Sequence, residues 1–221
     1  MKTARALAYE FHKHNIQLVY GGGTAGLMGE IARTLVSLSG PESVHGIIPK
    51  ALVRVEPGYE QSKDGAKGPS SDGTAQNGKD TERTISDTDQ ASSLLQEQVY
   101  GVTTIVADMH TRKRMMATKV MEGGPGSGFV TLAGGFGTIE EVMEMTTWNQ
   151  LGIHKRAIIL MNVNGYWDGL LAWVKNAVDN GYIGAANAHI LVAAKHVSEV
   201  VPLLASYKVS AGQMKLDWGN E

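Results

Sequence analysis

Short apolar runs alternate with longer segments of helical periodicity along most of the chain. Their length and composition are typical of strands buried on both faces of a parallel sheet. The runs stand at residues 16–20, 44–48, 102–107, 129–132, 157–163 and 190–193. Between them, leucines, isoleucines and valines recur at helical spacing, most clearly in residues 27–38 and 170–178. The alternation predicts an α/β fold: a doubly wound, Rossmann-like parallel sheet flanked by helices, with ligands at the carboxyl ends of its strands.

One segment departs from this pattern. Residues 57–93 are rich in Gly, Ser, Asp, Lys, Thr and Gln and contain few apolar side chains. Such a composition buries too little surface to offset the entropy of ordering. We therefore expect a disordered or loosely held insertion within a single domain that spans residues 1–221.

Composition narrows the classes of function. The chain has 221 residues, 20 Lys and Arg against 22 Asp and Glu, and a formal net charge of −2. This balance gives no electrostatic reason to expect a nucleic-acid polymer or a membrane as partner. The sequence has no cysteine, which excludes disulfides, thiolate metal ligands and cysteine nucleophiles. No apolar run approaches the roughly 18 residues of a membrane span, and the first residues do not resemble a signal peptide. We expect a cytoplasmic protein.

A first glycine loop follows the first apolar run. Gly21, Gly23 and Gly26 have the G-x-G-x-x-G spacing of dinucleotide sites. Those sites also need an acidic residue at the end of the next strand, where this chain has Pro49 and Lys50. A dinucleotide site is therefore disfavoured. A tight turn without a ligand and a turn that offers backbone N–H groups to one phosphate both remain open.

A second glycine loop, residues 132–141, also leads from an apolar run into a helix. Its glycines would let the backbone approach an anion. Thr138 and Glu141 also match T-x-x-E, the capping box in which two side chains satisfy the first backbone donors of a helix. Local evidence leaves capping and catalysis equally open for Glu141. Glu140 and Glu141 would point about 100° apart on a helix and so could not face one atom equally.

Basic residues begin a third helix. Arg112 and Lys113 follow the run that ends at Ala107, and cations there oppose the helix dipole. This placement indicates a compensating anion, either a ligand phosphate or a carboxylate. The alternative is a solvated basic face.

Taken together, these motifs resemble one known family. The segments 21–29, 109–113 and 134–141 are similar, in this order, to those of the LONELY GUY (LOG) proteins, the cytokinin riboside 5′-monophosphate phosphoribohydrolases often mislabelled lysine decarboxylases. Residues 147–154 and 165–171 also fit. The resemblance covers nearly the whole chain outside 57–93.

The resemblance implies hydrolysis of the N-glycosidic bond of a nucleoside 5′-monophosphate, either AMP or prenylated AMP, by a homodimer without cofactor or metal. Arg112 and Glu141 would be the catalytic pair. The carboxylate would stabilise the positive charge that develops on the sugar or activate the attacking water. The residues implied in substrate and phosphate binding are Gly22, Gly23, Gly26, Met28, Lys113, Gly135, Phe136, Gly137, Thr138, Ile139, Glu140 and Thr147.

This chain departs from the family pattern in three places. Ala133 replaces a usual proline, and residues 123–128 form a longer link than usual. The family begins with a strand and a Gly-Ser turn, whereas this sequence begins with the helix expected at 3–14. We therefore expect a form with a long insertion and no N-terminal strand. Two other functions stay open: a carrier of nucleotide or molybdenum cofactor with a similar fold, and a pyridoxal-phosphate lysine decarboxylase, for which Lys113 is the candidate Schiff-base lysine.

Overall fold

The computed structural model describes residues 1–53, 55–56 and 97–218, so the insertion predicted at 57–93 lies outside the described residues. Each of the predicted apolar runs forms a strand whose ends lie within two residues of the prediction. The strands are β1 Leu18–Tyr20, β2 Val44–Pro49, β3 Val102–Val106, β4 Gly128–Thr131, β5 Ala157–Met161 and β6 Leu191–Ala194.

Helices follow most of the strands, as the alternating pattern predicts. They are α1 Lys2–Lys13, α2 Gly26–Ser39, α3 Lys50–Val53, α5 Met109–Met121, α6 Phe136–Leu151, α7 Asp168–Asp179 and α8 Val200–Ser206. Short 3₁₀ turns cover Pro41–Ser43, Val163–Gly165, Ala185–Asn187 and Val197–Glu199. Among the helices of the described residues, none is long and apolar enough to cross a membrane.

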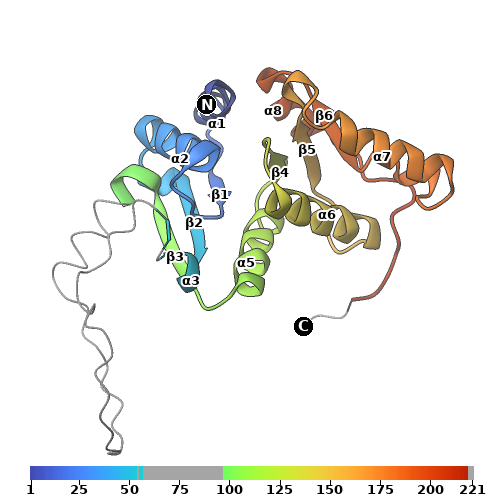
Figure 1. Cartoon of the computed structure of the whole chain (residues 1–221), viewed down its shortest axis with the longest axis horizontal. Helices are drawn as coiled ribbons and strands as arrows, with labels where there is room; N and C mark the ends of the chain where they lie inside the picture. The colour runs from blue at the N-terminus through green and yellow to red at the C-terminus, as the bar shows by residue number, and fades with distance from the viewer. Residues whose placement is uncertain (54, 57–96, 219–221) are drawn as a thin grey trace, which may run out of the picture.

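The described strands pair into two parallel three-stranded sheets. Their orders are β1-β2-β3 and β4-β5-β6. β1 and β4 are the strands on the facing edges of the two sheets (Figure 1). The fold is thus α/β with parallel strands, as predicted, but hydrogen bonding divides the strands into two groups.

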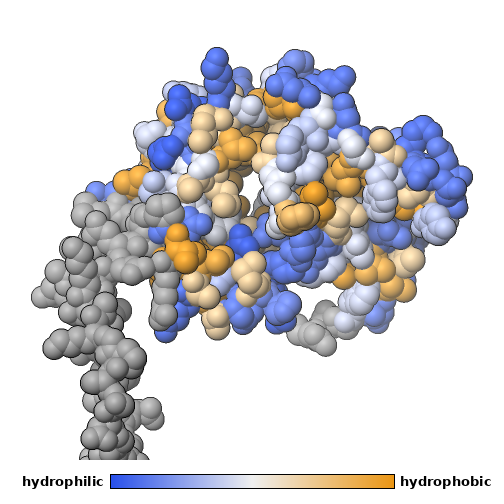
Figure 2. Space-filling model, in the orientation of Figure 1, coloured by the Kyte–Doolittle hydropathy of each residue, from blue (hydrophilic) through white to orange (hydrophobic). Residues whose placement is uncertain are grey.

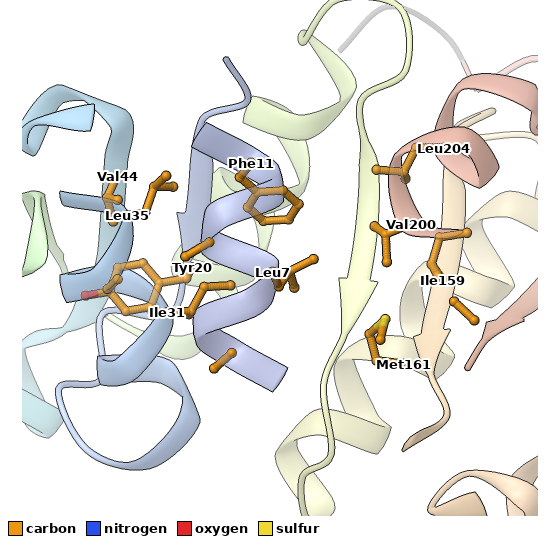
Figure 3. Packing of buried hydrophobic residues seen from close by; sticks show 14 of the residues in the cluster. Leu7, Phe11, Tyr20, Ile31, Leu35, Val44, Ile159, Met161, Val200 and Leu204 are labelled. Atoms are coloured by element: carbon orange, nitrogen blue, oxygen red, sulfur yellow. The ribbon is translucent and has the colours of Figure 1, made fainter. Parts of the chain in front are cut away.

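Helices cover the sheets in two layers, and β5 shows how the sequence produces them. Ile159 and Met161 pack with α1, α2 and α8, while Ile158 and Leu160 pack with α5, α6 and α7. Figure 3 shows the first of these clusters, with Leu7 of α1 across from residues of β5 and α8. Because alternate residues of a strand point to opposite faces, a strand covered on both sides is apolar throughout.

A buried carboxylate ties α1 to α2. Glu30 of α2 is only 2% exposed and forms ion pairs with Arg5 of α1 and Arg33 of its own helix. Hydrogen bonds from Arg5 and then Arg33 lower the pKa of the Glu30 carboxyl below its usual value. The pairing fixes the layer of helices that flanks the first glycine loop.

Candidate active site

The first glycine loop joins β1 to α2 and lies against an arginine from another element. Gly22 and Gly26 have φ angles of +75° and +60°, which side-chain-bearing residues rarely adopt. A Cβ added to Gly21 would lie 1.8 Å from Nη2 of Arg112. Glycine is therefore required at position 21 for the guanidinium to approach this loop.

Arg112 itself is buried at the start of α5. The carboxylate of Asp108 caps this helix by accepting hydrogen bonds from the backbone N–H and the hydroxyl of Thr111, both at 2.9 Å. One turn in, Arg112 is 9% exposed; its Nε donates to the carbonyl of Ile47 at 3.2 Å and its Nη1 to Glu141 Oε1 at 2.9 Å. For Arg112, the alternative of a solvated basic face is wrong.

The second glycine loop leads into α6, which begins earlier than the T-x-x-E pattern requires. Its N-cap is Gly135 and its first residue is Phe136, with no side-chain cap. Thr138 and Glu141 both lie inside the helix, so the capping-box interpretation is wrong. The Glu141 carboxylate is bonded to Arg112 rather than to the backbone at the start of its own helix.

A second set of charges lies beside this pair. Nζ of Lys113 forms ion pairs with Glu140 and with Glu144, the latter at 3.2 Å. Glu140 and Glu141 thus engage different cations, as their offset on the helix predicts. Carboxylates, one of the two kinds of anion predicted, therefore lie beside these cations of α5. Hydrogen bonding to Glu140 raises the pKa of the Lys113 amine and keeps it protonated.

Glu141 occupies an environment that disfavours its charge. Burial raises the pKa of its carboxyl above the usual glutamate value, and the attraction of Arg112 offsets this only in part. The charge of Glu140 raises this pKa further. A carboxyl tuned in this way can exchange a proton nearer to neutral pH than an ordinary glutamate, a property suited to acid–base chemistry.

The Arg112–Glu141 pair borders a cavity of about 900 Å³ that lies between β1 and β4. Met28 and Thr138, which were also predicted, line the same cavity, as does Gly21. Gly21 follows β1 directly and lies against Arg112, so this part of the cavity is at the carboxyl end of a strand, where an α/β fold places its ligands.

The other predicted residues lie in the first glycine loop, at the start of α6 or farther along α6. Gly22, Gly23 and Gly26 form the turn into α2, and an added Cβ at Gly23 would meet the methyl group of Met28. Gly135, Phe136, Gly137 and Ile139 lie at the start of α6, and Phe136 is 97% exposed. Thr147 is exposed, donates its hydroxyl to the carbonyl of Met143, and lies about 9 Å along α6 from Glu141. Thr147 is not brought to the pair.

Some contributors were not predicted from the sequence. Tyr166 donates its hydroxyl to the carbonyl of Gly134 at 2.6 Å and so holds the second glycine loop. Glu56 accepts a hydrogen bond from the backbone N–H of Thr24 at 3.1 Å in the first loop. Glu144 had a recognisable signal, because it follows Glu140 by one helical turn. The carbonyl of Ile47, like any backbone atom, had none.

Comparisons with known proteins agree with this geometry. A family model described as "Possible lysine decarboxylase" matches residues 28–204. A bifunctional cytokinin biosynthesis protein of Fusarium pseudograminearum is 43% identical over 218 residues, covering 99% of this chain but only 39% of the fungal protein. A cytokinin riboside 5′-monophosphate phosphoribohydrolase of Arabidopsis thaliana is 34% identical over 93% of this chain and 75% of its own length. A probable enzyme of the same name from Oryza sativa subsp. japonica is 36% identical over 93% of this chain and 71% of its own length.

Proposed function

Because the chain belongs to the LONELY GUY family, whose model carries the description of possible lysine decarboxylases, we propose that it hydrolyses the N-glycosidic bond of cytokinin riboside 5′-monophosphates. The products are the free base and ribose 5-phosphate, and AMP is a second candidate substrate. The observation that carries this proposal is the partly buried hydrogen bond between Arg112 and Glu141 at the edge of the cavity.

The chemistry assigns separate tasks to the two residues. As the C–N bond breaks, its electron pair leaves with the base, positive charge develops on the sugar, and a water oxygen bonds to the anomeric carbon. The Glu141 carboxylate stabilises that charge or takes the proton of the water. Arg112 holds Glu141 in place, because its bond to the carbonyl of Ile47 anchors the guanidinium.

Phosphate recognition belongs in this proposal to the glycine loops. Helices α2 and α6 both begin beside the cavity, and the N-terminus of a helix favours an anion. We assign the phosphate and ribose contacts to the predicted residues of these two loops and to Lys113. Lys113 would have to exchange its ion pairs with Glu140 and Glu144 to reach the nucleotide.

The same ion pairs argue against lysine decarboxylation. A Schiff base with pyridoxal phosphate requires an unprotonated amine. The amine of Lys113, the candidate for that role, is paired with two carboxylates, and its pKa is raised. The description of the family as decarboxylases therefore finds no support at this residue.

The test is to incubate the purified protein with AMP and with isopentenyladenosine 5′-monophosphate and to measure free base and ribose 5-phosphate. We expect cleavage of the nucleotides and little cleavage of the corresponding nucleosides, which lack the phosphate. Binding of both nucleotides without cleavage would instead favour the carrier function. Equal turnover of nucleoside and nucleotide would contradict phosphate recognition by the loops.

Three further expectations belong to this proposal: a single domain over residues 1–221, a cytoplasmic location and a homodimer. The apolar segment 142–151 supports the last of these. Val142 and Met145 are buried within their own subunit, while Met143 and Trp148 stay partly exposed and are available to a partner. Light scattering at micromolar concentration tests the dimer, and a fully active monomer would contradict it.

A further inference from the structure

The turn that leads from β5 into α7 is tied down at both ends by one buried side chain. Asn162 is only 6% exposed, and its backbone N–H donates to the carbonyl of Ala194 in β6 at 2.8 Å. Its side-chain oxygen accepts from the backbone N–H of Trp167, and its side-chain N–H donates to Asp168, both at 2.7 Å. Asn162 therefore joins the start of this turn to its end and to the neighbouring strand.

Between these contacts the backbone adopts a conformation that residues with side chains rarely take. Asn164 and Gly165 have φ angles of +53° and +73°. Such a conformation persists only where the surrounding structure fixes it. A Cβ added to Gly165 would also lie 2.5 Å from Oδ2 of Asp168. The turn is therefore held in one shape, which determines the direction of the next residue, Tyr166.

Tyr166 extends from this turn to the second glycine loop. Its ring lies edge-on to the ring of Trp167, with the centroids 4.9 Å apart, and Trp167 is buried. Its hydroxyl donates to the carbonyl of Gly134 at 2.6 Å. A Cβ added to Gly134 would lie 2.1 Å from Oγ1 of Thr138, so the loop also contacts the start of α6. The peptide that joins Gly134 to Gly135 is thus held through its carbonyl oxygen.

The orientation of this peptide determines where the N–H of Gly135 points. In a trans peptide, the C=O and the next N–H lie in one plane and point in opposite directions. The carbonyl of Gly134 points to Tyr166, which follows β5, whereas the cavity lies along the other edge of β4. Figure 2 shows a hollow between the two halves of the molecule in this region. The N–H of Gly135 therefore points away from β5, towards the side on which the cavity and Arg112 lie.

The start of α6 also leaves room for a ligand. Gly135 is the N-cap, no side chain caps the helix, and among the described residues the N–H of Gly135 has no hydrogen-bond partner. Its φ of −97° is open to any residue, so the backbone does not require glycine here. A Cβ added to Gly135 or to Gly137 would meet nothing within 4 Å. These two glycines leave space that the folded chain does not itself use.

We propose that Tyr166 is a positioning residue for phosphate recognition: its hydroxyl holds the carbonyl of Gly134 and so directs the N–H of Gly135 at the phosphate of the nucleotide. This inference rests on the proposed function, which assigns the phosphate to the glycine loops. An N–H that is already oriented loses little freedom when the phosphate binds, so the phosphate binds more tightly. Adenosine has no phosphate and gains nothing from this orientation.

The test replaces Tyr166 with phenylalanine, which removes the hydroxyl and keeps the ring beside Trp167. Loss of one net hydrogen bond should raise KM for AMP roughly five- to tenfold and leave kcat within about twofold of the wild-type value. Calorimetry should show AMP binding weakened by a similar factor and adenosine binding unchanged. Tyr182→Phe is the matched control, because it removes a hydroxyl from a tyrosine that is 88% exposed and lies after α7, and it should change none of these values.

Two further measurements separate positioning from a general loss of structure. In the ligand-free protein, the NMR order parameter of the Gly135 amide should fall from about 0.85, typical of rigid backbone, to below about 0.6 in Tyr166→Phe. Gly135→Ala should keep the fold, because its Cβ meets open space, and should weaken AMP binding by crowding the phosphate. The double variant should bind AMP no more weakly than the weaker single variant, because both changes act on the same N–H.

Each of three results would overturn the role of Tyr166. The first is an equal loss of affinity for AMP and adenosine in Tyr166→Phe. The second is an unchanged order parameter of the Gly135 amide, and the third is a double variant whose losses add. A wild-type protein that binds AMP without cleaving it would count against the proposed hydrolysis alone, because the binding and order-parameter measurements need no turnover.

Discussion

Replacement of Glu141 by glutamine removes one charge from the candidate site and leaves its shape. The glutamine oxygen can still accept the hydrogen bond that Nη1 of Arg112 donates at 2.9 Å, and Arg112 keeps its bond to the carbonyl of Ile47. The helix start is unaffected, because the N-cap is Gly135 and Glu141 lies inside the helix. The variant therefore isolates the contribution of the charge.

The expected effects on stability and on rate differ widely. Because burial raises the pKa of Glu141, folding does not favour its ionised form, and a neutral side chain forfeits no net stabilisation of charge. The glutamine also keeps a hydrogen bond to Arg112, so the free energy of unfolding should change by no more than about 1 kcal/mol, or roughly 2–4 °C in Tm. In contrast, loss of an electrostatic group that faces developing charge lowers kcat by roughly 10²–10³.

Steady-state release of free base from AMP or isopentenyladenosine 5′-monophosphate measures this effect, with thermal melts of the same samples. Glu140→Gln is the matched comparison, because Glu140 is the adjacent residue and pairs with Lys113 instead of Arg112. Because Glu140 belongs to the loop assigned to substrate contacts, we expect this variant to raise KM and to leave kcat near the wild-type value. If Glu141→Gln kept near-normal turnover, or if both variants lost activity equally, the catalytic role assigned to Glu141 would be wrong.

The strands were the part of the fold that the sequence predicted best. Burial on both faces of a strand produces a continuous apolar run, although β3 is an exception, since Val106 is its buried residue and Ile105 is 56% exposed. β5 is the clearest case, since all five of its residues are buried. The pattern did not predict that β1 and β4 stay unpaired with each other. An apolar run indicates a strand but carries no information about which strands lie beside it.

Some features of the candidate site could likewise be predicted from the sequence, and others could not. The glycine loops and the basic start of α5 were recognisable because they combine turn residues, strand ends and charges in short segments. The sequence could not decide whether Glu141 caps the helix or acts in catalysis, because the answer depends on where α6 begins. Gly135 is the N-cap of this helix and precedes Thr138 by three residues, so Glu141 lies beyond the capping position and bonds to Arg112 instead. Contacts between such distant segments emerge only from the packing of the elements.

The remaining predictions concern pH and packing. The acid limb of kcat/KM should have an apparent pKa above the ordinary 4.5 of glutamate, because activity is lost as Glu141 protonates; a limb at or below 4.5 would contradict the raised pKa. Gly21→Ala should lower kcat/KM by roughly 10²-fold, because the added Cβ would lie 1.8 Å from Nη2 of Arg112. Gly169→Ala on α7 should be neutral, because a Cβ added there would meet no other atom within 4 Å. Glu30→Gln should lower Tm at pH 7, because the carboxylate between two arginines is lost. The pKa of Glu30 is lowered by folding, so its stabilisation is complete above the ordinary 4.5 and is lost as the pH falls through the lower folded value. The Tm difference between wild type and Glu30→Gln should therefore shrink in melts at successively lower pH. A difference that stayed constant down to pH values well below 4.5 would show that packing, and not the charge of Glu30, accounts for the lower Tm.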